Sequence, residues 1–204
     1  FYFANPIVNT DSNLFRAWEE FKSFYDAGVT FNRSDAEKFG LLFCDYRPCL
    51  LPDKKFQPEN QSDVFFVGMA KDRLKKILEV YEHLTGAGLK CNFYVPGVPK
   101  AQQKYAEDIH YYELSSWTWR PYDEILQHVK NTKCVLEILP YDQNYSSLRL
   151  FEALWYHKKL LTTNSEAPGS WYYHPEIIQC FKEASEINTD FITSPLTFED
   201  EQRI

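Results

Sequence analysis

From residue 63 onward, short apolar runs alternate with longer stretches in which apolar residues recur at helical spacing. The apolar runs predict strands at 64–67, 91–95, 109–114, 134–139, 159–163 and 177–181. The helical spacing predicts helices over 72–84, 122–132 and 146–157. Because strands and helices alternate over about 120 residues, the pattern predicts a Rossmann-like α/β fold, a parallel sheet with helices on both faces.

A parallel sheet of this kind binds its ligands beyond the carboxyl ends of its strands. We therefore expect a binding site in the loops that follow Val67, Val95, Leu114, Leu139 and Thr163. Two of these loops, the first and the fourth, lead into segments with side chains suited to anions.

The segment 145–163 predicts a loop of small residues, a helix and a short strand. Ser146 and Ser147 stand at the start of that helix, where backbone N–H groups attract anions. Glu152, farther along the helix, can accept hydrogen bonds from two hydroxyl groups. A diphosphate and a ribose need these two features, so the segment predicts a nucleotide-sugar site. Serine also caps helices without a ligand, and Glu152 can equally be a glutamate on the solvent face, so both alternatives stay open.

Basic residues follow the first of these strands. Lys71 and Arg73 follow Gly68 in the loop after that strand, and Gly68 leaves room for a phosphate beside the backbone. A guanidinium can bind phosphate through two hydrogen bonds, and an ammonium acts as a point charge. Arg149, one turn into the later helix, is a similar candidate. Surface basic residues are common at helix starts, so a purely structural role for these side chains stays open.

Residues 1–62 follow a different pattern. They predict strands at 1–4, 28–31 and 41–44, a helix over 13–24, and a helix over 34–39 capped by Ser34 with Glu37 three residues later. Three strands are too few for a complete doubly wound domain, so residues 1–47 are interpreted as a partial N-terminal α/β segment. The stretch 48–62, rich in Pro, Asp, Asn and Gln, is the predicted linker to a domain over 63–204. Because the chain starts without methionine, we expect it to be a piece of a longer protein.

Composition narrows the classes of function. The net charge of −7 and the pI near 5.3 argue against a nucleic-acid-binding protein. No apolar run reaches the roughly 20 residues that span a membrane. Neither the five cysteines nor the five histidines show metal-ligand spacing, which predicts no metal site, no disulfide framework and a reducing cytoplasm. The absence of an early Gly-x-Gly-x-x-Gly loop argues against a dinucleotide cofactor.

Three segments resemble bacterial glycosyltransferases that build lipopolysaccharide or capsular polysaccharide. They are Val29-Thr-Phe-Asn-Arg-Ser-Asp-Ala-Glu-Lys-Phe-Gly-Leu41, Asp63-Val-Phe-Phe-Val-Gly-Met-Ala-Lys-Asp-Arg73 and Ser147-Leu-Arg-Leu-Phe-Glu-Ala-Leu-Trp-Tyr-His-Lys-Lys-Leu-Leu-Thr-Thr-Asn164. The resemblance covers roughly residues 25–195, and the third segment is the most specific. It implies a GT-B fold, in which two Rossmann-like domains face a cleft and the C-terminal domain holds the donor.

The resemblance implies transfer of a sugar from a nucleotide-diphosphate sugar to a glycan or lipid-linked acceptor. It implies no cofactor and no metal. It also implies a cytoplasmic location at the inner face of the membrane, with peripheral membrane association. The loop that ends at Pro121 and Tyr122 would cradle the base. The expected nucleotide-sugar-binding residues are Gly68, Lys71, Arg73, Tyr122, Ser146, Ser147, Arg149 and Glu152. No catalytic residue is assigned, because any general base would come from the N-terminal half.

The chain also departs from that family. Asn144 stands where many retaining enzymes of this type carry the first of two glutamates, and the loop 143–147 lacks their glycine. These departures favour an alternative, a non-catalytic Rossmann-like module that binds a nucleotide or a protein partner. A different α/β enzyme that acts on sugar nucleotides, such as an epimerase, is a third hypothesis.

Overall fold

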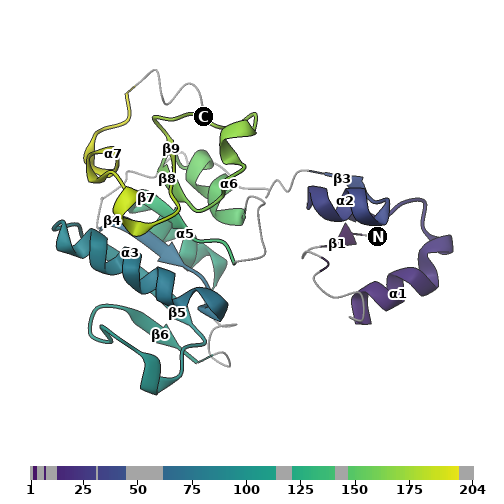
Figure 1. The fold of residues 1–204 in the computed structure, drawn as a ribbon, viewed down its shortest axis with the longest axis horizontal. Coiled ribbons are helices and arrows are strands. Elements are labelled where there is room, and N and C mark those ends of the chain that lie inside the picture. Colours follow the sequence, from purple (N-terminus) through teal and green to yellow (C-terminus); the bar gives the residue numbers. More distant parts are fainter. Residues whose placement is uncertain are drawn as a thin grey trace. The chain divides into compact units, whose positions relative to one another are not determined.

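The computed structural model describes residues 2–3, 7, 13–30, 32–44, 62–113, 121–140 and 147–197. The chain divides into two compact units, residues 1–48 and residues 49–204 (Figure 1). The predicted linker lies outside the described residues except for Ser62. The larger unit contains the predicted binding loops.

The larger unit is built on a six-stranded parallel sheet with the order β6-β5-β4-β7-β8-β9. Its strands are β4 (Ser62–Val67), β5 (Cys91–Pro96), β6 (His110–Tyr112), β7 (Thr132–Glu137), β8 (Lys159–Thr162) and β9 (Ile178–Cys180). The chain therefore moves outward from β4 in one direction, returns to the centre at β7, and moves outward in the other direction. This order is that of a doubly wound, Rossmann-like sheet, and it confirms the predicted fold class.

Helices cover both faces of this sheet (Figure 1). They are α3 (Leu74–Gly86), α5 (Tyr122–Lys130), α6 (Leu148–Trp155) and α7 (Thr189–Thr193), with short 3₁₀ turns η2 (Lys71–Arg73), η3 (Lys100–Gln102), η4 (Ala167–Gly169) and η5 (Ala184–Glu186). Alternate residues of each strand face opposite sides, so Phe66 packs toward α3 and α7 while Phe65 packs toward α5 and α6. Burying each ring contributes about 1.5–3 kcal/mol.

The ends of the helices differ slightly from the predicted ends. Helix α5 begins at Tyr122 as predicted, with Pro121 as its N-cap, but it stops at Lys130 so that Thr132 begins β7. Helix α6 ends with His157 at a φ of 52°, and the Lys158 N–H donates to the Ala153 carbonyl at 2.8 Å. That bond closes a Schellman motif, which turns the chain directly into β8.

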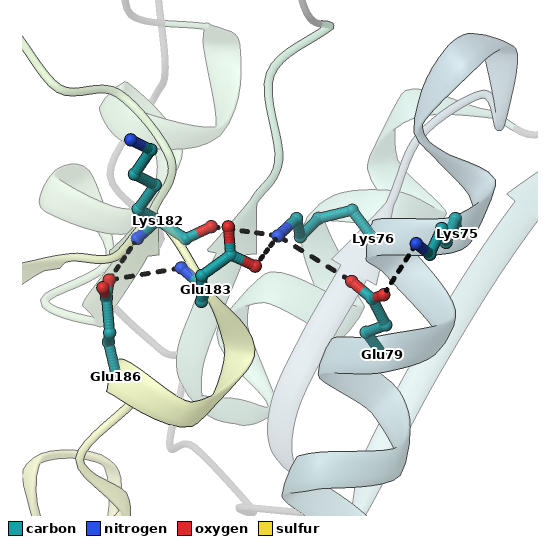
Figure 2. Close-up of polar contacts among 6 residues, drawn as sticks. All are labelled: Lys75, Lys76, Glu79, Lys182, Glu183 and Glu186. Atoms are coloured by element: carbon teal, nitrogen blue, oxygen red, sulfur yellow. Dashed lines mark hydrogen bonds and ion pairs between the residues drawn. The ribbon is translucent and has the colours of Figure 1, made fainter.

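A polar network joins α3 to the segment that follows β9. The Lys76 ammonium donates to the Glu183 carboxylate at 2.6 Å and to the Lys182 carbonyl at 3.0 Å. Figure 2 shows Lys76 between these two groups and Glu79 of its own helix. Glu186 accepts from the N–H groups of Lys182 and Glu183, and these bonds lower the pKa of its carboxyl. The network is exposed, so it fixes the path of this segment and adds little stability.

The smaller unit contains a three-stranded parallel sheet with the order β1-β2-β3. Its elements are β1 (Tyr2–Phe3), α1 (Asn13–Phe21), η1 (Lys22–Phe24), β2 (Val29–Thr30), α2 (Arg33–Phe39) and β3 (Leu42–Phe43). Phe15, Trp18 and Leu41 form its core. The predicted cap at Ser34 is wrong, because Asn32 caps α2 by accepting from the Asp35 N–H. Asp35 is itself fixed by the Ile7 N–H at 2.8 Å, which sets where the helix begins.

Candidate functional site

A cavity of about 230 Å³ opens at the carboxyl ends of β4 and β7, the two central strands between which the chain changes direction. Doubly wound sheets hold their ligands at this point. Residues from the two loops and from the start of α6 line it: Phe66, Val67, Lys71, Arg73, Leu136, Glu137, Ile138, Leu139, Pro140, Ser147, Leu148 and Arg149. Its volume is below the roughly 300–1,000 Å³ of pockets that enclose a drug-sized ligand, so it suits one part of such a ligand.

Three cationic side chains line this cavity. Lys71 is exposed and has a φ of 43°, an uncommon conformation for a residue with a side chain. Arg73 donates through Nε to the Met69 carbonyl at 2.9 Å and through Nη1 to the Ile138 carbonyl. Arg73 therefore connects the loop after β4 to the loop after β7, and fixes a positive charge between them. Arg149 supplies the third positive charge from α6.

Gly68 is required by the position of Arg73. A Cβ atom at residue 68 would lie 2.7 Å from Nη2 of Arg73 and 3.2 Å from Cζ of Phe66. The space that the missing side chain leaves is therefore filled by the guanidinium itself.

Replacing Gly68 with alanine is expected to lower the free energy of unfolding by about 1–2 kcal/mol, because the Arg73 guanidinium has to shift. Urea unfolding measures this change. Gly86→Ala is the control, since no heavy atom lies within 4 Å of a Cβ there and alanine favours the helix by about 0.5–1 kcal/mol. Equal stability of the Gly68→Ala and wild-type proteins would show that Arg73 does not depend on this space.

The first turn of α6 forms one wall of the cavity. Ser147 is its N-cap, and the Ser147 hydroxyl accepts from the Arg149 N–H at 3.1 Å. The Ser147 N–H and hydroxyl both donate to one carboxylate oxygen of Glu137, at 2.9 and 2.5 Å. A carboxylate of the protein therefore already occupies part of the positive end of this helix.

Glu137 is a residue of the site that was not predicted from the sequence. It ends β7, is only 3% exposed, and also accepts from the Thr162 hydroxyl of β8 at 2.5 Å. Its single carboxylate thereby connects β7, β8 and α6. The signal was an acidic residue inside the apolar run 134–139, because a buried carboxylate needs several donors.

Glu152 lies inside the protein rather than on the solvent face of α6. Its side chain is 0% exposed and is not part of the cavity wall described above. One carboxylate oxygen accepts from the Tyr122 hydroxyl at 2.6 Å, and the other pairs with the Arg149 guanidinium. Burial raises the pKa of the Glu152 carboxyl, and Arg149 and Tyr122 oppose that shift.

The structure brings most of the predicted residues together. Lys71, Arg73, Ser147 and Arg149 line the cavity, and Gly68 contacts Arg73 as described. Tyr122 and Glu152 form a second row behind Arg149. Ser146 lies outside the described residues, so its position stays a prediction.

The remaining predictions concern metals and membranes. Within the described residues, no group of three or more potential ligands could hold a metal ion. Cys134 is buried, Cys91 and Cys180 are partly buried, and Cys44 is exposed, all as free thiols, while Cys49 lies outside the described residues. None of the helices that the structure describes has both the length and the apolar character needed to cross a bilayer.

Comparisons with known proteins give a likeness to a solved structure. No family model matches the chain, and a search of curated proteins finds no match. Among solved structures, the crystal structure of the glycotransferase of kitacinnamycin is similar with a TM-score of 0.43 and 12% sequence identity. The likeness covers 88% of this chain and 49% of that one, so the chain spans about half the length of that protein. At this TM-score the likeness carries no argument about function.

Proposed function

We propose that residues 63–204 bind a nucleotide-diphosphate sugar and that the chain is the donor half of a cytoplasmic glycosyltransferase. The observation that carries this proposal is the cavity between β4 and β7, where Lys71, Arg73 and Arg149 meet the start of α6. These three cations outnumber the one carboxylate of the cavity wall, Glu137, and cations at the ligand-binding point of a doubly wound sheet suit a diphosphate. The cavity is small, which fits the diphosphate alone, with the base and the sugar extending beyond it.

In this proposal the protein stabilises the departing diphosphate. The negative charge on that group grows as its bond to the anomeric carbon breaks, and fixed positive groups lower the energy of such a state. Arg73 is held in place by two backbone carbonyls before any ligand arrives. The acceptor would be a glycan or a lipid-linked sugar of a cell-envelope polysaccharide, as the sequence resemblance implies.

The proposal predicts that one of the nucleoside diphosphates UDP, GDP and dTDP raises the midpoint of thermal unfolding. A ligand that binds only the folded protein adds about 2.7 kcal/mol at 100 times its dissociation constant, which corresponds to roughly 5–10 °C for a chain of this size. Differential scanning fluorimetry at millimolar nucleotide measures the shift. If the wild-type midpoint does not move for any nucleotide, the proposal is wrong.

A matched pair of lysines controls for non-specific charge effects. Lys71→Gln is expected to reduce the shift, because Lys71 lines the cavity. Lys75→Gln is expected to leave it unchanged, since the Lys75 side chain is 90% exposed and pairs with Glu79 on the outer surface of α3. Equal losses in both variants would indicate general attraction of anions rather than a site.

The second candidate is a non-catalytic nucleotide-binding module. Asn144, which stands in place of an expected glutamate, favours it. The hydrogen bonds of both Glu152 oxygens to Tyr122 and Arg149 favour it as well. Release of nucleoside diphosphate from a sugar donor distinguishes the two candidates. Binding without release by the longest available form of the protein would favour the module.

A further inference from the structure

Tyr122, Glu152 and Arg149 form a row that leads from α5, through the inside of the unit, to the wall of the cavity. Tyr122 is 40% exposed as a whole residue, the Glu152 side chain is 0% exposed, and the Arg149 side chain is 16% exposed and lines the cavity. Among the residues that the structure describes, each Glu152 oxygen has one partner, the Tyr122 hydroxyl on one side and the Arg149 guanidinium on the other.

This arrangement makes Glu152 and Arg149 depend on each other. A buried carboxylate without a cation is costly, and Arg149 compensates Glu152. In return, Glu152 restricts the long Arg149 side chain to one position. A guanidinium has five N–H donors, so pairing with one carboxylate oxygen leaves donors for a phosphate.

A direct contact between Glu152 and a ligand meets an obstacle. A ligand hydroxyl would have to replace the Tyr122 hydroxyl, because Glu152 has no exposed surface. Arg149 needs no such rearrangement, since it already lines the cavity.

We infer that Glu152 is a positioning residue, which holds the Arg149 guanidinium at the cavity wall so that Arg149 contacts the diphosphate of the ligand. Tyr122 aligns Glu152 from α5. This inference rests on the proposed function and assigns Glu152 a role other than the ribose contact that the sequence suggests.

Inorganic pyrophosphate separates the two roles, because it contains the diphosphate and no ribose. Calorimetric titration would compare pyrophosphate with the nucleoside diphosphate that binds best. Glu152→Gln is expected to weaken both by the same factor, about tenfold, through the loss of a fixed charge-assisted hydrogen bond. An unchanged affinity for pyrophosphate together with weaker nucleotide binding would overturn the inference and restore the ribose role.

Two further variants keep the test decisive if Glu152→Gln does not fold. Tyr122→Phe changes an exposed side chain and is expected to weaken both ligands by an equal, smaller factor of about three. Tighter nucleotide binding by Tyr122→Phe would instead mean that a ligand hydroxyl takes the vacated carboxylate oxygen, which contradicts the inference. Asp123→Asn, at the exposed neighbour of Tyr122, is the control and is expected to change neither affinity.

A double-mutant cycle tests whether Glu152 acts through Arg149. In an Arg149→Ala background, Glu152→Gln is expected to cause no further loss of pyrophosphate affinity. An additional loss there would overturn the inference. Wild-type protein that binds neither pyrophosphate nor any nucleoside diphosphate would remove the proposed function and this inference together. Wild-type binding with an unchanged Glu152→Gln variant would remove the inference alone.

Discussion

Replacing Glu137 with leucine is expected to lower the free energy of unfolding by about 3 kcal/mol, because three donors lose their acceptor. These donors are the Ser147 N–H, the Ser147 hydroxyl and the Thr162 hydroxyl. Thr162 is fully buried, so water cannot replace the carboxylate there. The Ser147 groups lie at the cavity, where water can compensate part of the loss. Urea unfolding followed by circular dichroism measures the change.

Glu137→Gln is the matched control for this prediction. Glutamine keeps the volume and one acceptor oxygen, and its amide can donate to a reoriented Thr162 hydroxyl, so the expected loss is only about 1 kcal/mol. Thr162→Ser keeps the hydroxyl and tests the same contact from β8. A leucine variant as stable as the wild type would show that Glu137 does not hold α6 against the sheet.

Substituting methionine for either of two adjacent lysines is expected to change the free energy of unfolding in opposite directions. Lys158 is 6% exposed, and within the described residues its ammonium has no hydrogen bond or ion pair, so burial lowers its pKa from 10.5 to about 8. The ammonium of Lys159 donates to the Ser194 carbonyl and hydroxyl at 2.6 and 2.7 Å and to the Phe191 carbonyl. Lys158→Met is therefore expected to stabilise the protein, and Lys159→Met to destabilise it by about 3 kcal/mol.

The burial of Lys158 makes the stability of the folded protein depend on pH. Above pH 10.5 the side chain is neutral in both the folded and the unfolded protein, and its burial has no charge penalty. As the pH falls toward 8, only the unfolded chain takes up the proton, so the folded state loses stability by up to about 3 kcal/mol. The stability difference between Lys158→Met and wild type should therefore grow as the pH falls from 10.5 to 8 and stay constant below 8. A difference that does not change with pH would contradict the burial of this charge.

Much of the larger unit could be predicted from the sequence because its signals are local. Ile77, Leu78, Tyr81 and Leu84 recur at helical spacing, and all four are buried on one side of α3. The ends of some elements depend instead on contacts between distant residues. Asn32 caps α2 in place of Ser34 because Asp35 is also fixed by Ile7, 28 residues away, and no local pattern contains that contact.

The sequence indicated which cationic residues lie near one another but not how their side chains are held. Lys71, Arg73 and Arg149 stand near the ends of predicted elements, so the general rule for parallel sheets placed them together. The contact of Arg73 with the Ile138 carbonyl spans 65 residues and depends on the register of β4 and β7. The burial of Glu152 likewise depends on Tyr122, which is 30 residues away on another helix.

The position of β4 has a consequence for how the site forms. Strand β4 pairs with β5, which follows it closely in the chain, and with β7, which follows only after β6 and α5. One half of the sheet contains β4, β5 and β6, and the other half contains β7, β8 and β9. The cavity wall comes from both halves, so any opening that separates β7 from β4 would abolish the cavity. An anion bound in the cavity would therefore link the two halves. Amide hydrogen exchange should slow in both halves at once when ligand is added, rather than only around the loops that contact it.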